Sequence, residues 1–235
     1  IEDDEPKKWK LLYVSPVGER GKEFLKKIIM KFGHKDFDYL IFVYDDTKFG
    51  EEIFRPCRFI YEKGTRWYFM RKYVTPEYCK NYDYIFAWPD DIDVNDFSYE
   101  NFIKIMRRNH LEMAQPALTP DSYFSHDITV KNENYEIGRL TDFVEIMVPV
   151  FTKDAYTKYW KMIDNDFLPW GWGYDYLAKS ICGYKRIGII DCETVVHTRP
   201  LSGGKPEAGL AMENFLKKYS ENYKKSEYTI YGPLF

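Results

Sequence analysis

This chain of 235 residues lacks two features that would indicate a membrane or secretory location. It has no run of 18 or more apolar residues, the length that a membrane-spanning helix requires, and residues 1–8 are too charged for a signal peptide. We therefore expect a soluble domain. Because the chain does not begin with Met, an upstream anchor that has been removed stays open, and so does the choice between a cytoplasmic and a lumenal compartment.

The chain also lacks an excess of positive charge and a thiolate motif. Its 34 Lys and Arg residues against 37 Asp and Glu give a net charge of -3, whereas nucleic-acid binding relies on clustered positive charge, so nucleic acid is not an expected partner. None of the four cysteines forms a CxxC pair, which argues against a zinc site built from thiolates. We expect buried thiols, while a disulfide between Cys182 and Cys192 stays open.

Aromatic residues, by contrast, make up 19% of the chain. Tyr and Trp combine an apolar ring with a hydrogen-bonding group, which suits a sugar-binding surface. The same residues also fill protein cores, so composition alone leaves both interpretations open.

Short apolar runs alternate with amphipathic segments in the first half of the chain. The runs at 10–15, 39–44 and 82–88 are predicted strands, and apolar residues between Phe24 and Phe32 recur every three or four positions, as in a helix. This alternation is typical of an α/β fold with an open, mostly parallel sheet and helices on both faces.

The second half continues this pattern less regularly around a long polar loop at 120–139. Further strands are predicted at 113–117, 143–151, 185–191 and 194–197, and helices at 98–109, 153–165, 175–182 and 211–223. No repeat or interior linker divides the chain, so we expect one domain over residues 1–235.

The predicted strand 82–88 runs directly into Pro89-Asp90-Asp91-Ile92-Asp93. Open α/β sheets bind ligands at the carboxyl ends of their strands. Gathered carboxylates repel one another and favour a bound cation, and Mg2+ or Mn2+ with a substrate diphosphate in its coordination shell fits such ligands. A solvated acidic turn is the alternative.

Other residues near predicted strand ends are candidates for donor binding. Asp45 follows the second strand and would hydrogen-bond a nucleobase or ribose, or else only end a turn. Ser15 and Val17 close the first strand, where the backbone would approach a nucleotide. Arg66 and Arg71 would neutralise phosphates, or merely solvate a helix.

A glycine-bearing loop offers a candidate acceptor pocket. Trp170 and Trp172 provide ring faces for a sugar, and Asp175 follows at the start of a predicted helix. A carboxylate near a helix N-terminus stays ionised and can accept the proton of an attacking hydroxyl as general base. A structural helix cap is the alternative role for Asp175.

Three further polar residues interrupt apolar or irregular segments. Glu145 lies within the predicted strand 143–151, where burial is costly unless the carboxylate is paired or faces a cleft, although it would simply point outward on an alternating strand. His197 ends an apolar strand and would complete a metal shell. His126 lies in the long loop, and a structural role is open for both histidines.

Seven segments of the chain occur in a particular order and spacing: Tyr84–Val94, Gln115–Leu118, Ser125–Thr129, Val144–Phe151, Trp172–Asp175, Ile189–Asp191 and Val196–His197. Taken together, they resemble the family catalogued as domain of unknown function 707. Two shorter segments, Thr65–Phe69 and Tyr44-Asp45, also resemble that family, and the order and spacing agree over nearly the whole chain.

The resemblance implies a relationship to glycosyltransferases with the GT-A fold, which place an Asp-x-Asp metal motif at a strand end, a catalytic carboxylate at a later loop–helix junction and often a late His on the metal. By position, Asp91 matches the last acid of the family's Trp-Asp-Glu-Asp run and Asp90 its Glu, while Pro89 replaces the first Asp. Asp90 and Asp93 therefore compete for the role beside Asp91. His126, Glu145, Asp175 and His197 match family positions.

These observations predict a metal-dependent, inverting glycosyltransferase that moves a sugar from a nucleotide-diphosphate donor to a glycan hydroxyl. Residues 1–94 would bind the nucleotide and residues 95–235 the acceptor. Mn2+ or Mg2+ would be held by Asp91, Asp93 and His197, with Asp175 and Glu145 as catalytic residues. A non-catalytic carbohydrate-binding protein and a metal-dependent hydrolase are the alternatives.

Overall fold

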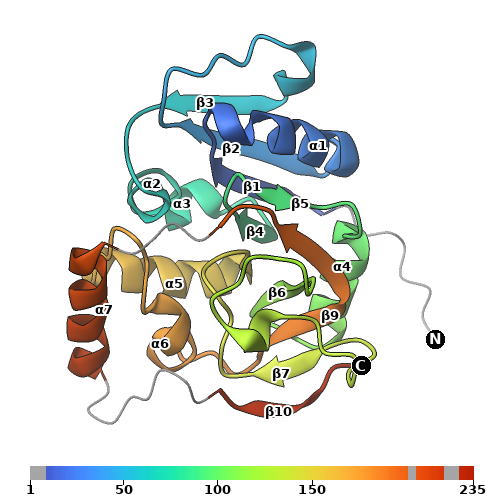
Figure 1. Ribbon diagram of the computed structural model, residues 1–235, viewed down its shortest axis with the longest axis vertical. Helices are drawn as coiled ribbons and strands as arrows, with labels where there is room; N and C mark the ends of the chain where they lie inside the picture. Colours follow the sequence, from blue (N-terminus) through green and yellow to red (C-terminus); the bar gives the residue numbers. More distant parts are fainter. Residues whose placement is uncertain (1–8, 201–204, 220–227) are drawn as a thin grey trace.

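The computed structural model describes residues 9–200, 205–219 and 228–235, which form a ten-stranded sheet in the order β10-β7-β9-β6-β8-β4-β1-β2-β3, with β5 paired to β9 (Figure 1). The strands are β1 Leu11–Pro16, β2 Phe37–Val43, β3 Cys57–Tyr61, β4 Tyr84–Ala87, β5 Ile92–Asp93, β6 Met113–Leu118, β7 Arg139–Thr141, β8 Val150–Thr152, β9 Ile187–His197 and β10 Ile230–Pro233. The helices are α1 Lys22–Phe32, α2 Arg66–Tyr73, α3 Pro76–Cys79, α4 Tyr99–Arg108, α5 Lys153–Asn165, α6 Tyr174–Ile181 and α7 Pro206–Tyr219.

The sheet is mostly parallel, as predicted. Strands β1 to β4 run in one direction, and β6, β9 and β10 share that direction, whereas β5, β7 and β8 run the other way. Of the reversed strands, β7 and β8 lie in the second half of the chain, and the two-residue β5 pairs with β9 of that half. The regular first half therefore has the pattern of a doubly wound sheet, and the second half departs from it.

Helices cover both faces of the sheet. On one face, α1 and α4 pack on a core that includes Phe32, Phe86 and Phe102, and on the other α2, α3, α5, α6 and α7 enclose a core that includes Trp67 and Tyr159 (Figure 1). The helix starts predicted near residues 98, 153 and 175 are observed, whereas the last helix begins at Pro206 and not at residue 211. Thr75 and Ser98 each accept a hydrogen bond from the backbone N–H three residues on, which satisfies a free donor of the first turn.

The prediction of a strand over 143–151 is wrong for its first seven residues, because only Val150–Thr152 forms β8. Side chains satisfy the polar backbone that a neighbouring strand would otherwise pair. The Arg66 guanidinium donates to the carbonyls of Ile146 and Met147, and Gln115 Oε1 accepts from Glu145 N at 2.6 Å. Residues 143–149 are thus a buried, irregular segment that crosses the sheet face.

Three further features differ from expectation. The two late strands merge into β9, with a register shift opposite Pro116 and Ala117. Strands β5 and β10 had no apolar run of their own and form only as partners of β9 and β7. The charged residues 1–8 and the predicted helical residues 220–223 lie outside the described part of the chain.

The four cysteines are free thiols, so Cys182 and Cys192 are not joined. Cys79 and Cys182 are buried, Cys57 is half-buried and Cys192 is exposed, which corrects the expectation of burial for Cys192. Within the described ranges, no helix has the length and apolar character needed to cross a membrane.

Candidate active site

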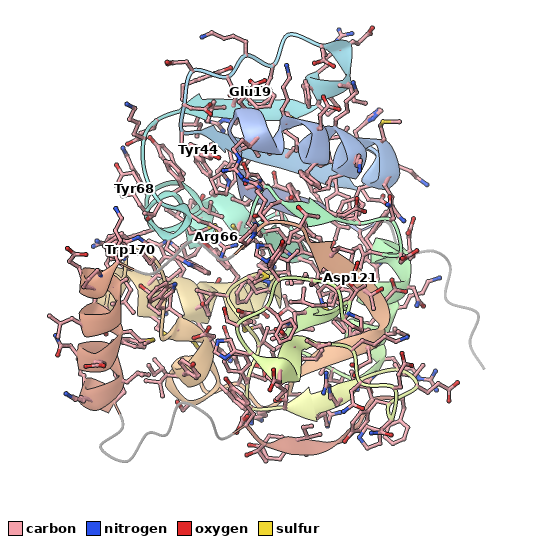
Figure 2. All side chains as sticks on the ribbon, in the orientation of Figure 1. Glu19, Tyr44, Arg66, Tyr68, Asp121 and Trp170 are labelled. Carbon is pink, nitrogen blue, oxygen red and sulfur yellow. The ribbon has the colours of Figure 1, made fainter. Side chains whose placement is uncertain are left out.

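A cavity of about 590 Å³ opens where β4 and β9 end, and its size lies in the usual range for small-molecule sites. The walls come from the segment after β4, the end of β9, the buried segment 143–149, the loop at 125–126 and the start of α6. The lining residues are Arg20, Arg66, Pro89, Asp91, Ser125, His126, Glu145, Ile146, Met147, Trp170, Trp172, Gly173, Asp175, Tyr176, His197, Arg199, Pro200 and Met212. Figure 2 shows Arg66 near the centre of the molecule, with Trp170 beside the upper end of α7.

Asp91 and His197 meet at the edge of this cavity because β5 pairs with the end of β9. His197 Nε2 lies 3.2 Å from Asp91 Oδ2, and both side chains are largely buried. Burial lowers the pKa of His197, but the hydrogen bond and charge of Asp91 outweigh it and raise the pKa above its ordinary value. The second carboxylate oxygen, Asp91 Oδ1, is buried and has no hydrogen-bond partner among the described residues.

The Asp91 and His197 pair fits a divalent cation. His197 Nδ1 lies 2.7 Å from the Tyr123 carbonyl, which can only accept, so Nδ1 carries a proton. Nε2 then faces a carboxylate with either a proton or a lone pair, and a lone pair there requires a cation between the two groups. Two ligands at right angles on Mg2+ lie about 3 Å apart, close to the distance observed.

This pair is small for a metal site. In the part of the chain that the structure describes, no three His, Cys, Asp or Glu side chains gather into a metal-binding group. Mg2+ is commonly held by one or two carboxylates, with substrate phosphates completing its shell. The donor set at Asp91 and His197 is therefore compatible with an ion that arrives with a diphosphate.

Asp90 is held quite differently from its neighbour. Its Oδ2 accepts from Gly18 N at 3.2 Å and Tyr44 Oη at 3.0 Å, and its Oδ1 accepts from Arg199 Nη2 at 2.7 Å. Gly21 permits this approach, because a Cβ there would lie 2.2 Å from Asp90 Oδ2. Asp90 therefore orients Arg199, whose Nε lies 3.4 Å from Asp91 Oδ2.

Two further carboxyl groups line this cavity, and neither forms an ion pair among the described residues. Asp175, 4% exposed, accepts from Tyr176 N at 3.0 Å at the start of α6, and Glu145, also 4% exposed, has an Oε2 without a hydrogen-bond partner in the described residues. Burial raises the pKa of Asp175 to about 7. Burial, followed by the charge of Asp175, raises the pKa of Glu145 to about 8. Because their negative charges repel, ionising one carboxyl group makes ionising the other harder, and the lower pKa of the two is that of Asp175.

The predicted acceptor residues line the same cavity. Trp170 and Trp172 lie on the loop before α6, where Gly171 and Gly173 have φ of 75° and 106°, a conformation that glycine adopts without strain. His126 is hydrogen-bonded to Tyr228 Oη, and burial lowers its pKa. The structure thus gathers these rings and Asp175 around one space, and their roles stay predictions.

Five of the predicted site residues lie elsewhere. Asp93 binds Lys27 Nζ and Asn95 N at 3.1 and 2.9 Å, and Arg71 pairs with Asp164 at the surface. The Asp45 carboxylate accepts from Glu19 N and Thr47 N. The remaining two, Ser15 and Val17, are buried at the end of β1.

Sequence reasoning missed Arg199, Arg20 and Tyr176, which line the cavity. Arg199 follows His197 by two residues, and its place after a strand end was the available signal. What the sequence could not show is that β9 ends beside Asp90. Tyr176 follows Asp175, so the same helix start presents both to the cavity.

An open α/β sheet with a strand-end acid, a late histidine and a carboxylate at a helix start defines the GT-A type of nucleotide-sugar glycosyltransferase fold. Solved structures support this class. The chain is similar to TarS residues 1–349 of S. aureus in complex with UDP-GlcNAc, with a TM-score of 0.53, 10% identity and coverage of 83% of this chain and 60% of that one. It is also similar to GalNAc-T7 with UDP, GalNAc and Mn2+, with a TM-score of 0.60, 10% identity and coverage of 89% and 48%.

Sequence comparison then gives the particular family. The model described as a protein of unknown function, DUF707, matches residues 1–142 and 138–230, so the chain belongs to that family. No curated protein matches the chain in sequence. The chain spans 60% and 48% of the two solved chains, and at such low identity the likeness shows the fold alone.

Proposed function

We propose that this protein is a glycosyltransferase that moves a sugar from a nucleoside-diphosphate donor to a carbohydrate hydroxyl. The observation that carries the proposal is that one cavity holds a cation-compatible pair, Asp91 and His197, and a buried carboxyl group, Asp175, whose pKa lies near 7. A group-transfer site needs charge neutralisation for the leaving diphosphate and a base for the attacking hydroxyl. The fold neighbours that bind UDP and UDP-GlcNAc support this assignment.

The diphosphate would lie at the edge formed by Asp91, His197 and Arg199. Mn2+ or Mg2+ bound to Asp91 and His197 would supply positive charge to the departing phosphate oxygens. Arg199, oriented by Asp90, adds a fixed cation that can donate to the same oxygens. On this proposal residues 1–94 bind the nucleotide, and residues 95–235 supply Arg199 and the acceptor pocket.

The acceptor sugar would lie between the tryptophan rings and Asp175. As the acceptor oxygen attacks the anomeric carbon, Asp175 takes the hydroxyl proton and the bond from that carbon to the phosphate oxygen breaks. A single displacement of this kind inverts the configuration. Glu145, protonated while Asp175 is ionised, can donate a hydrogen bond to an acceptor hydroxyl.

The test is a screen of nucleotide sugars with a panel of oligosaccharides, with and without Mn2+, read by nucleoside-diphosphate release and by mass change of the acceptor. Transfer to a saccharide supports the proposal. Release of free sugar at the same rate without acceptor would indicate a hydrolase. Saccharide binding with no affinity for any nucleotide would indicate a non-catalytic binding protein.

A further inference from the structure

A second cavity, of about 440 Å³, lies on the other side of Tyr176. It is lined by Asp142, Phe143, Tyr176, Leu177, Lys179, Ser180, Tyr184, Tyr228 and Tyr231. These residues come from α6, from the end of β7 and from β10 and the residues just before it, which lie together in Figure 1. The predicted acceptor residues lie outside this cavity, and neither the fold likeness nor the family description assigns it a role.

The two cavities share a wall of aromatic rings. Tyr176 lines both, and the ring of His126, from the first cavity, contacts Phe143, Tyr176 and Tyr228, with centroid separations of 4.9, 5.6 and 5.7 Å. Asp175 and Lys179 are four residues apart on α6, about 6 Å along the axis, a span comparable to one sugar ring. The lining of the second cavity thus extends along α6 from Tyr176, the residue after Asp175, over about the length of one sugar ring.

The lining of the second cavity suits a neutral, hydroxyl-rich ligand. Tyr176, Tyr228 and Tyr231 expose part of their side chains and Ser180 is exposed, whereas Phe143 and Tyr184 are buried. The charged side chains in the lining are one Asp and one Lys, so neither sign of charge predominates, as it would for a phosphate or an acidic ligand. Tyr231 is 59% exposed and has Lys179 Nζ 5.1 Å from its ring centre.

We propose that this second cavity binds the sugar next to the acceptor sugar, so that the acceptor is a saccharide of at least two units. The proposal rests on the proposed glycosyltransferase function for its biological meaning. The binding of saccharides to the second cavity, however, can be measured without any sugar donor. The second unit adds affinity because it is tethered to the first and needs no separate encounter.

The experiment measures binding by calorimetry and by saturation-transfer NMR for methyl glycosides of glucose, galactose, xylose, arabinose and rhamnose and for their di- and trisaccharides. In the unaltered protein we expect the preferred disaccharide to bind about tenfold more tightly than its methyl glycoside. Tyr231→Ala should remove most of this gain and leave methyl glycoside binding unchanged. Ser180→Trp, which places a large ring in the cavity from an exposed helical position, should do the same.

The matched control is Tyr61→Ala. Tyr61 is likewise an exposed tyrosine, 54% accessible, with Lys48 Nζ 5.5 Å from its ring centre, but it lies on β3 at the far edge of the sheet. It should leave the disaccharide gain intact. The proposal is overturned if no saccharide of the panel binds, if disaccharides bind no better than methyl glycosides, or if Tyr61→Ala and Tyr231→Ala act alike.

Failure of the proposed function has a different signature. If the protein turns over no nucleotide sugar but binds disaccharides in a manner that depends on Tyr231, the subsite proposal stands and the glycosyltransferase proposal is wrong. If it transfers sugar equally well to methyl glycosides and to disaccharides, the glycosyltransferase proposal stands and the subsite proposal is wrong.

Discussion

Two pairs of carboxyl groups, one with Asp91 and one with Glu145 and Asp175 in the lining of the same cavity, are held in different surroundings. Asp90 and Asp91 meet nitrogen donors, namely the Arg199 guanidinium, the Gly18 amide and the His197 ring. Glu145 and Asp175 form no ion pair among the described residues, and burial raises the pKa of each, which favours their protonated forms. On the proposed function, the first arrangement keeps charge in place for the diphosphate, and the second provides a proton acceptor near neutral pH.

The largest expected effect comes from removing the proton acceptor. In Asp175→Asn the amide preserves shape and cannot take a proton, so kcat should fall about 10³-fold, within the range for general bases. UDP affinity should stay unchanged, because on the proposed function Asp91, His197 and Arg199 hold the diphosphate and Asp175 takes no part in holding it. Steady-state transfer rates and calorimetry measure the two quantities. Full activity in Asp175→Asn would remove it from the role of base.

The next largest effect concerns Asp91, which is compared with Asp93 by replacing each with asparagine. Asp91→Asn should lower transfer about 100-fold and abolish the strengthening of UDP binding by Mn2+, because Asp91 pairs with His197 through Oδ2 and has a buried Oδ1 without a partner among the described residues. Asp93→Asn is the matched control and should keep both properties, since that carboxylate pairs with Lys27. Equal losses in the two variants would instead support the literal Asp-x-Asp motif at residues 91–93.

The sequence was sufficient for the sheet and for much of the cavity, because both follow local rules. Apolar runs ending in acids predict strands with ligand-binding ends, which located Asp91, and the glycine loop before a helix located Asp175. The end of an apolar strand likewise located His197, and the family resemblance supported that position. These predictions depended on neighbours in the chain.

What could not be predicted depends on partners distant in sequence. Glu145 is buried because Arg66 and Gln115 bind the backbone around it and prevent a strand there. Arg199 reaches Asp90 only because β9 ends beside β5. A pattern that alternates along one segment holds no information on these long-range contacts.

A smaller effect, about tenfold per pH unit, is expected in the pH dependence of kcat. Activity should rise as pH increases through about 7, where Asp175 loses its proton, and fall above about 8, where Glu145 loses its own. Glu145→Gln stays neutral at all pH values and should remove the alkaline fall while keeping the acidic rise. A profile for Glu145→Gln that keeps both limbs would assign the upper pKa to another group.

The last effect concerns the free energy of unfolding, which should change in opposite directions when a carboxyl group of each pair is replaced by an amide. Burial raises the pKa of Glu145 to about 8, so between about pH 4.5 and 8 the folded state binds more protons than the unfolded chain, and the free energy of unfolding falls as pH rises through that range. Glu145→Gln should therefore unfold at higher urea concentration than the unaltered protein at pH 8, by an amount equivalent to ~1–3 kcal/mol.

Asp90→Asn should do the reverse at the same pH, losing ~1–3 kcal/mol, because it leaves the Arg199 guanidinium without its anion and presents an amide to the Gly18 N–H. Urea denaturation of the three proteins at pH 6 and pH 8 measures both changes. The advantage of Glu145→Gln should shrink at pH 6, where the Glu145 carboxyl is protonated in the folded protein. If both substitutions destabilise the fold equally at pH 8, the two carboxyl pairs do not differ in how their charge is neutralised.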